Sequence, residues 1–157
     1  MNPIAFLTAL LPAPVSALCA IVSTPLAEYG RALEPIVVSA NANAEAKGAA
    51  DTLADYLGRI SGARFEVKTG DGESGIVVGR AEDFPKLKTG VAFHPSDAMR
   101  GEEYLLRSQA HGVWLLGDSD LAVRHPVWVV SLARWGSTAA GRALTFGGWK
   151  KLPRAWH

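Results

Sequence analysis

The sequence predicts an α+β fold: a mixed β-sheet of about five strands with two main helices packed on it. Three observations support this prediction. One long segment places apolar residues at helical spacing, several short segments show the alternating or continuous apolar pattern of strands, and the order is strand, helix, strand, strand, hairpin, helix. A chain of 157 residues is long enough for one domain with its own core.

The clearest helix is predicted to begin after Asn43, whose side chain can cap it. Apolar residues then recur at steps of four and three, which places them on one helical face. These residues are Ala46, Ala50, Leu53, Leu57 and Ile60. Ser61-Gly62 predicts the end of the helix, because glycine readily adopts the left-handed conformation found after many helices.

Short strands are predicted on both sides of this helix in the sequence. Pro35 to Val38 is a short apolar run, and Arg64 to Lys68 alternates charged and apolar residues as a half-buried strand does. Ile76 to Val78 is continuously apolar, so we expect a central strand covered on both faces. A long irregular connection is expected over residues 79–100.

The most clearly patterned stretch runs from Gly101 to Gly136. Residues 103–108 and 113–116 predict two strands joined by a tight turn at His111-Gly112. Ser119 or Asp120 is placed to cap the following helix. Because an interior proline costs about 3 kcal/mol, Pro126 predicts that this helix either kinks or begins at the proline.

We expect one apolar face of this second helix to point inward. Its predicted members are Leu121, Trp128, Leu132 and Trp135. Three valines make other faces of the helix apolar as well, at positions Val123, Val127 and Val130. This pattern predicts a helix that is deeply covered or that packs on something more than its own sheet.

The N-terminal residues differ from the rest. Residues 4–27 contain no charged side chain, and Ile4 to Leu11 has the size of a signal peptide's apolar region. Prolines at 12 and 14 argue against a stable membrane span. We expect residues 1–27 to be an export signal, which implies a periplasmic or extracellular protein, or otherwise an apolar leader. Residues 34–136 form the predicted domain, and residues 137–157 an atypical, poorly ordered tail.

Composition and motifs exclude several functional classes. The net charge is +1 with scattered basic residues, so no nucleic-acid partner is expected. Cys19 is the only cysteine, so the chain can form neither an internal disulfide nor a cysteine-based zinc site. No glycine-rich nucleotide loop is present, so no cofactor is expected. No metal site is expected either. The four histidines, His94, His111, His125 and His157, are not spaced as in any metal-binding motif.

One turn resembles a catalytic motif. Residues 117–121 read Gly-Asp-Ser-Asp-Leu, similar to the nucleophile block of one esterase family, which makes Asp118, Ser119 and Asp120 weak site candidates. A serine nucleophile needs a base and an orienting acid, and the Asp-x-x-His of that family does not follow Ser119. A strand-to-helix turn with a polar cap accounts for the same residues, so we expect no catalytic residue here.

The tryptophans are candidate sugar-binding residues, because their rings can stack on sugars. We expect Trp114, Trp128 and Trp135 to lie in the core. Trp149 and Trp156 lie in a basic tail, and we expect these two to be exposed.

The order of elements from Glu34 to Gly136 resembles a small α+β domain that precedes the catalytic barrel in several glycoside hydrolase families. The segments that carry the resemblance are Pro35 to Val38, Leu53-Ala54-Asp55-Tyr56-Leu57 with Ile60-Ser61-Gly62, Gly75-Ile76-Val77-Val78-Gly79, and Glu102-Glu103-Tyr104 with Gly112-Val113-Trp114-Leu115-Leu116-Gly117. The chain is similar in this respect to the N-terminal domain of family 67 α-glucuronidases. It is also similar to the second domain of family 20 β-hexosaminidases and to large bacterial proteins related to them.

This resemblance implies a non-catalytic accessory domain whose partner is a catalytic barrel. The paired carboxylates that cleave glycosidic bonds lie in that barrel, so they have no counterpart among these residues. After Trp135-Gly136 the sequence departs from the family pattern, and we expect replaced or frame-shifted sequence there. Two alternatives stay open: an independent secreted module that binds carbohydrate or protein, and a small hydrolase that uses the turn at residues 117–121.

Overall fold

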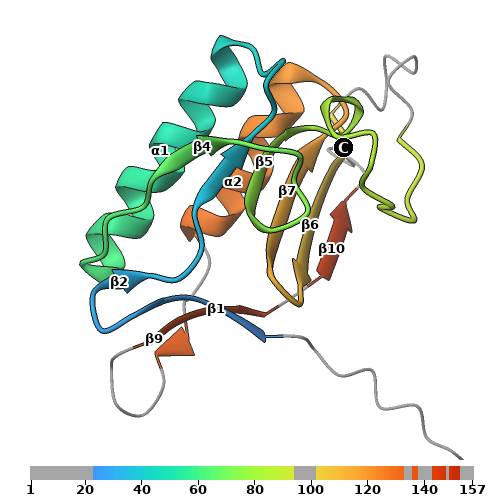
Figure 1. The fold of residues 1–157 in the computed structure, drawn as a ribbon. Helices are drawn as coiled ribbons and strands as arrows, with labels where there is room; N and C mark the ends of the chain where they lie inside the picture. Colours follow the sequence, from blue (N-terminus) through green and yellow to red (C-terminus); the bar gives the residue numbers. More distant parts are fainter. Residues whose placement is uncertain (1–22, 94–101, 133–135, 138–142, 148, 153–157) are drawn as a thin grey trace, which may run out of the picture.

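The computed structural model describes residues 23–93, 102–132, 136–137, 143–147 and 149–152, with side chains from Thr24 to Ser131 within those ranges (Figure 1). The expected leader up to residue 22, together with Cys19, His94, Trp135, Trp156 and His157, lies outside this description. Within the described residues, no helix is both long and apolar enough to cross a membrane.

The fold is α+β, as predicted, with two helices against a mixed sheet. The helices are α1 (Ala44–Ser61) and α2 (Asp120–Leu132), and a short 3-10 turn, η1, covers Ala81–Asp83. The strands are β1 (Ser23–Glu28), β2 (Arg31–Ala32), β3 (Ile36–Val38), β4 (Val67–Thr69), β5 (Gly75–Arg80), β6 (Tyr104–Gln109), β7 (Gly112–Gly117), β8 (Gly136–Ser137), β9 (Ala143–Gly147) and β10 (Trp149–Leu152).

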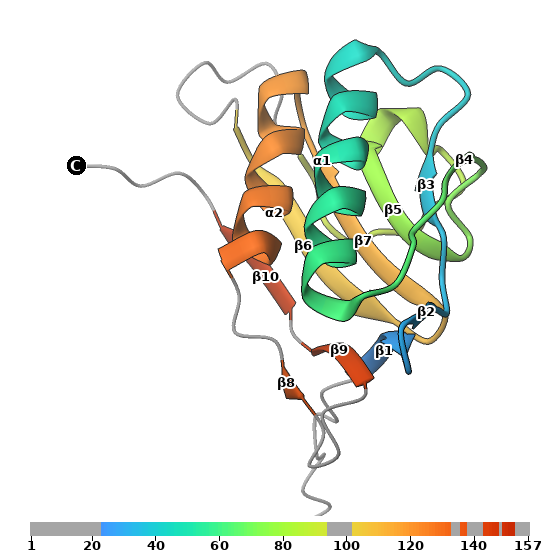
Figure 2. The same ribbon diagram turned by 90° about the vertical axis from the view of Figure 1, so that its left-hand side faces the viewer.

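The main sheet has six strands in the order β10-β6-β7-β5-β3-β4. β4, β3, β5 and β7 are parallel, with Ile36 opposite Ile76 and Val77 opposite Trp114. β6 and β7 form the predicted antiparallel hairpin, and β10 pairs with β6 at the sheet edge. The helices lie side by side in front of this sheet in Figure 2.

A second, smaller antiparallel sheet has the order β2-β1-β9-β8 and lies below the main sheet in Figure 1. The Thr24 hydroxyl joins the two sheets by donating a 2.6 Å hydrogen bond to the Gln109 carbonyl oxygen of β6. β1 overlaps the end of the expected leader, and its Leu26 and Ala27 are buried. β9 and β10 lie within residues 137–157, where the sequence predicted a poorly ordered tail.

α1 forms where its sequence predicts. The Asn43 side chain accepts a 2.9 Å hydrogen bond from the Ala46 amide, and Gly62 ends the helix with φ of 71°. Four of the five predicted inward residues are buried, but Ile60 is 41% exposed, which corrects its assignment. After Gly62 the chain turns back and brings Ala63 and Phe65 into the core, so these residues fill the space at this end of the helix.

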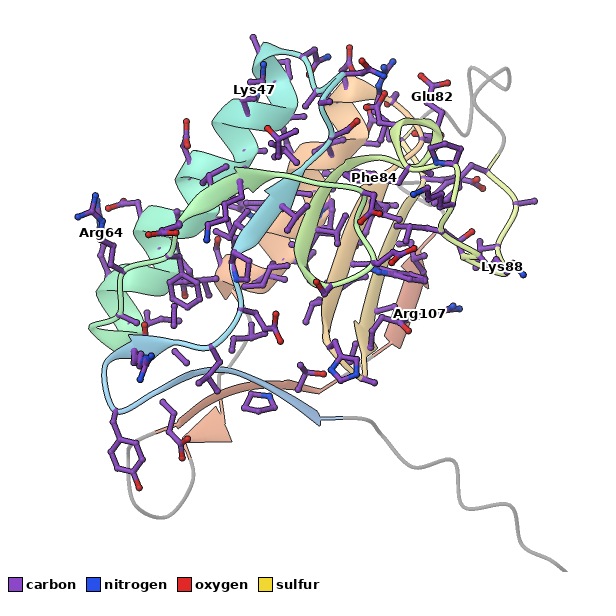
Figure 3. All side chains as sticks on the ribbon, viewed as in Figure 1. Lys47, Arg64, Glu82, Phe84, Lys88 and Arg107 are labelled. Atoms are coloured by element: carbon purple, nitrogen blue, oxygen red, sulfur yellow. The ribbon has the colours of Figure 1, made fainter. Side chains whose placement is uncertain are left out.

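β5 is the central strand, covered on both faces as predicted. On the helix side, Ile76 and Val78 belong to a large core that includes both helices. On the other side, Val77 packs with Phe84, which follows η1 and lies over this face of the sheet (Figure 3). Part of the expected irregular connection therefore covers the second face. β4 begins three residues later than Arg64, the predicted start of this strand.

The inner face of α2 differs from the prediction. Val123, Val127 and Val130 are buried against the sheet, whereas Leu121 and Trp128 are 53% and 66% exposed. The Leu132 side chain and Trp135 lie outside the described side chains. The helix also continues through Pro126, which is buried, so it does not begin at the proline.

Close packing at the end of β7 explains this orientation. A methyl group on Gly117 would lie 2.5 Å from the Val123 amide nitrogen and 2.7 Å from the Ala122 carbonyl carbon. The backbone of the first helical turn therefore rests directly on β7, and Ala122 and Val123 face the sheet. With this turn fixed, the 3.6-residue period directs Leu121 and Trp128 outward.

Gly117→Ala should lower the free energy of unfolding by about 1–3 kcal/mol, because the new methyl group meets backbone atoms that cannot rotate away. Gly48→Ala on α1 is the matched control, since no atom lies within 4 Å of its added methyl group. That control should stabilise the protein by about 0.5–1 kcal/mol through helix propensity. Urea unfolding of the two variants measures both changes in the free energy of unfolding. Equal changes in the two variants would contradict the proposed packing of Gly117.

Candidate functional site

The carboxyl ends of β5 and β7 meet the start of α2 at one edge of the main sheet. Open sheets with parallel strands commonly bind ligands at such an edge, so the polar residues at this edge are the first candidates for a functional site. The predicted candidates Asp118, Ser119 and Asp120 form the connection from β7 to α2. The structure brings them close to Arg80 at the end of β5 and to Glu103 before β6.

Arg80 pairs with three carboxylates. Its guanidinium nitrogens lie 2.9 Å from Asp83 Oδ1, 2.7 Å from Glu82 Oε1 and 3.3 Å from Asp120 Oδ1. Its hydrogen bonds with Asp83, chief among these contacts, raise the pKa of Arg80. Glu82 lies at the top of the molecule in Figure 3, at this same sheet edge. The arrangement ties η1 to the first turn of α2 and occupies Asp120 with a cation of the chain itself.

Asp118 is the most buried of the three candidates, with 8% of its surface exposed. Its backbone amide donates a 2.9 Å hydrogen bond to the Glu103 carbonyl, and Glu103 is itself only 2% exposed. Neither carboxylate oxygen of Asp118 receives a hydrogen bond of good geometry. Burial raises the pKa of Asp118, and nearby polar groups of Glu103 and Ser119 only partly offset this effect.

Ser119 caps α2, in agreement with one of the two predicted caps. Its Oγ accepts a 3.2 Å hydrogen bond from the Ala122 amide, and its carbonyl accepts another from Val123. His125, six residues farther on, points its Nε2 toward Glu102 at 3.7 Å and stacks on Tyr104 with ring centroids 6.0 Å apart. Helix capping therefore accounts for Ser119 and ion pairing with Arg80 for Asp120, whereas the Asp118 carboxylate has neither role.

A groove between the outer faces of α1 and α2 is the feature that sequence reasoning missed. It has a volume of about 790 Å³. α1 contributes small and polar residues, among them Glu45, Gly48 and Thr52, while α2 contributes Arg124 and Trp128. Trp128, assigned to the core from sequence, is thus the large aromatic residue of an open surface. The valines at steps of four and three were the sequence signal for the true inner face.

Trp114 also differs from the simple core prediction. It is half-buried and packs against the apolar cluster of Val77 and Phe84, on the sheet face opposite the helices. The guanidinium carbon of Arg107, a residue labelled in Figure 3, lies 6.0 Å from the centre of the Trp114 indole ring, which is a cation–π contact. The Trp114 ring is therefore in contact with Arg107 of the neighbouring strand, β6.

Searches for metal geometry and for related proteins gave no match. Among the described residues, no group of three or more histidine, cysteine, aspartate or glutamate side chains is arranged to hold a metal ion. No family model matches the sequence, and no curated protein matches it. The polar sheet edge and the groove between α1 and α2 are therefore the features of the fold from which a function can be proposed.

Asp118→Asn should be more stable than the wild type at pH 7. The raised pKa means that the folded state favours the protonated acid, so the wild type loses stability as pH rises through the folded-state pKa. Below the ordinary aspartate pKa of about 4 the difference should shrink, because both states of the wild type are then protonated. Thermal unfolding at about pH 3 and at about pH 7 measures this difference in stability.

Asp51→Asn, at an exposed position on α1, is the control and should change stability by no more than about 0.5 kcal/mol at either pH. A stability gain for Asp118→Asn that is equal at both pH values would contradict the assignment of the effect to a buried charge.

Proposed function

We propose that residues 34–136 act as a non-catalytic accessory domain of a glycoside hydrolase and support its carbohydrate-degrading barrel. The observation that carries this proposal is the outer face of the helix layer, where Leu121 and Trp128 are exposed beside an open groove. The carbohydrate context comes from the resemblance of the sequence between Glu34 and Gly136 to the accessory domains of glycoside hydrolases.

An exposed tryptophan in a groove is typical of a surface that another molecule covers. Tryptophan is enriched in protein interfaces and among the residues that contribute most of their binding energy. In contrast, several polar residues at the sheet edge have structural roles, because Asp83 and Asp120 pair with Arg80 and Ser119 caps α2. The helix face is thus a better candidate for contact with a barrel than the sheet edge is for chemistry.

One observation favours an independent binding module as the second candidate. The Trp128 ring lies in a groove with the hydroxyl groups of Thr52 and Ser131 and with charged side chains, including Glu45. An aromatic ring beside polar groups suits a sugar, which stacks its apolar face and hydrogen-bonds its hydroxyl groups. A protein partner would use the same features.

DNA sequencing immediately downstream of the His157 codon tests the accessory role. We expect an open frame that encodes a barrel with paired carboxylates. In a polypeptide containing both parts, Trp128→Glu should lower the barrel's melting temperature, while Lys47→Glu, outside the groove, should not. Unchanged barrel stability with Trp128→Glu, or no barrel in any frame, would contradict the proposal.

The isolated chain separates the alternatives. Sugar binding on a glycan array that is lost with Trp128→Ala would favour the independent module. Hydrolysis of model esters or glycosides that disappears with Ser119→Ala or Asp118→Ala would favour the small hydrolase. We expect neither activity.

A further inference from the structure

The groove between α1 and α2 has walls of different shape. On the α1 wall, the space above Gly48 is open, since an added methyl group there would meet no atom within 4 Å. On the α2 wall, Trp128 projects with 66% of its surface exposed, and Leu121 lies on the same helical face. One patch therefore holds both an exposed aromatic ring and a stretch of groove wall, at Gly48, that has no side chain.

The groove walls also differ in charge. Glu45 is exposed on α1, and Arg124 is exposed on α2. No ion pair joins these two side chains in the part of the chain that the structure describes. Opposite charges on facing walls give the patch little net charge, so it does not favour a strongly acidic or strongly basic partner.

We propose that a second copy of this chain covers the groove in a two-fold symmetric pair. A two-fold interface uses the same patch on both partners, so each feature must find its complement within that patch. In this pair Trp128 of each copy packs over Gly48 of the other, where the groove wall has no side chain, and each Arg124 faces the Glu45 of the other copy. This pairing goes beyond the proposed function and applies to the 157-residue chain by itself, because in a longer polypeptide the barrel would cover the same face.

Charge reversal provides the sharpest test, using the 157-residue chain. In Glu45→Arg, each copy presents two arginines across the two-fold axis, and in Arg124→Glu each presents two glutamates. Both variants should dimerise at least about tenfold more weakly than the wild type, because like charges meet twice. An equimolar mixture should recover a dimer, since every contact then joins opposite charges.

Sedimentation velocity over about 1–100 μM reports the dissociation constants, and circular dichroism verifies that each variant is folded. Trp128→Ala should also weaken dimerisation, whereas Lys47→Glu, a charge reversal on α1 outside the groove, should not. Association through the apolar leader would be insensitive to all of these substitutions.

Three results would overturn the proposal: a wild-type chain that is monomeric throughout this range, a dimer unaffected by Arg124→Glu, or a mixture of reversed variants that stays monomeric. None of them bears on barrel stability in the longer polypeptide, so failure of the dimer and failure of the accessory role are distinguishable.

Discussion

The contact between Gly117 and the first turn of α2 determines which surface the protein presents. With no side chain on Gly117, the backbone at Ala122 and Val123 packs directly on the end of β7. The helical period then places the valines of α2 on the sheet and leaves Leu121 and Trp128 outside. A small rotation of this helix would bury the tryptophan and remove the groove, so the proposed binding surface depends on this contact.

The polar cluster at the same sheet edge is best understood as support for this connection. Arg80 joins the end of β5 to η1 and to Asp120 at the start of α2, while Ser119 caps the helix. Asp118 is the exception, because its carboxylate accepts no hydrogen bond of good geometry and burial raises its pKa. The chemistry that the Gly-Asp-Ser-Asp sequence suggested is thus less well supported than its role as architecture.

Sequence reasoning succeeded where structure depends on neighbouring residues. The Asn43 cap, the Gly62 end of α1 and the continuous burial of β5 follow from local patterns. It failed where distant segments decide the outcome. The sequence predicts an inner face of α2 made of Leu121, Trp128, Leu132 and Trp135, but the valines form a second apolar face, and only packing against β7 selects between them. The cover that Phe84 gives the second sheet face likewise depends on a chain path that no periodicity encodes.

Thiol labelling reports which face of α2 is exposed. Cys19 is the only natural cysteine, so a Cys19→Ser background permits single cysteines at 127 and 128. In dilute protein, Trp128→Cys should react with iodoacetamide nearly as fast in the folded state as in urea. Val127→Cys should react only on unfolding, because Val127 is 4% exposed. A protected cysteine at 128 together with a reactive one at 127 would contradict the account.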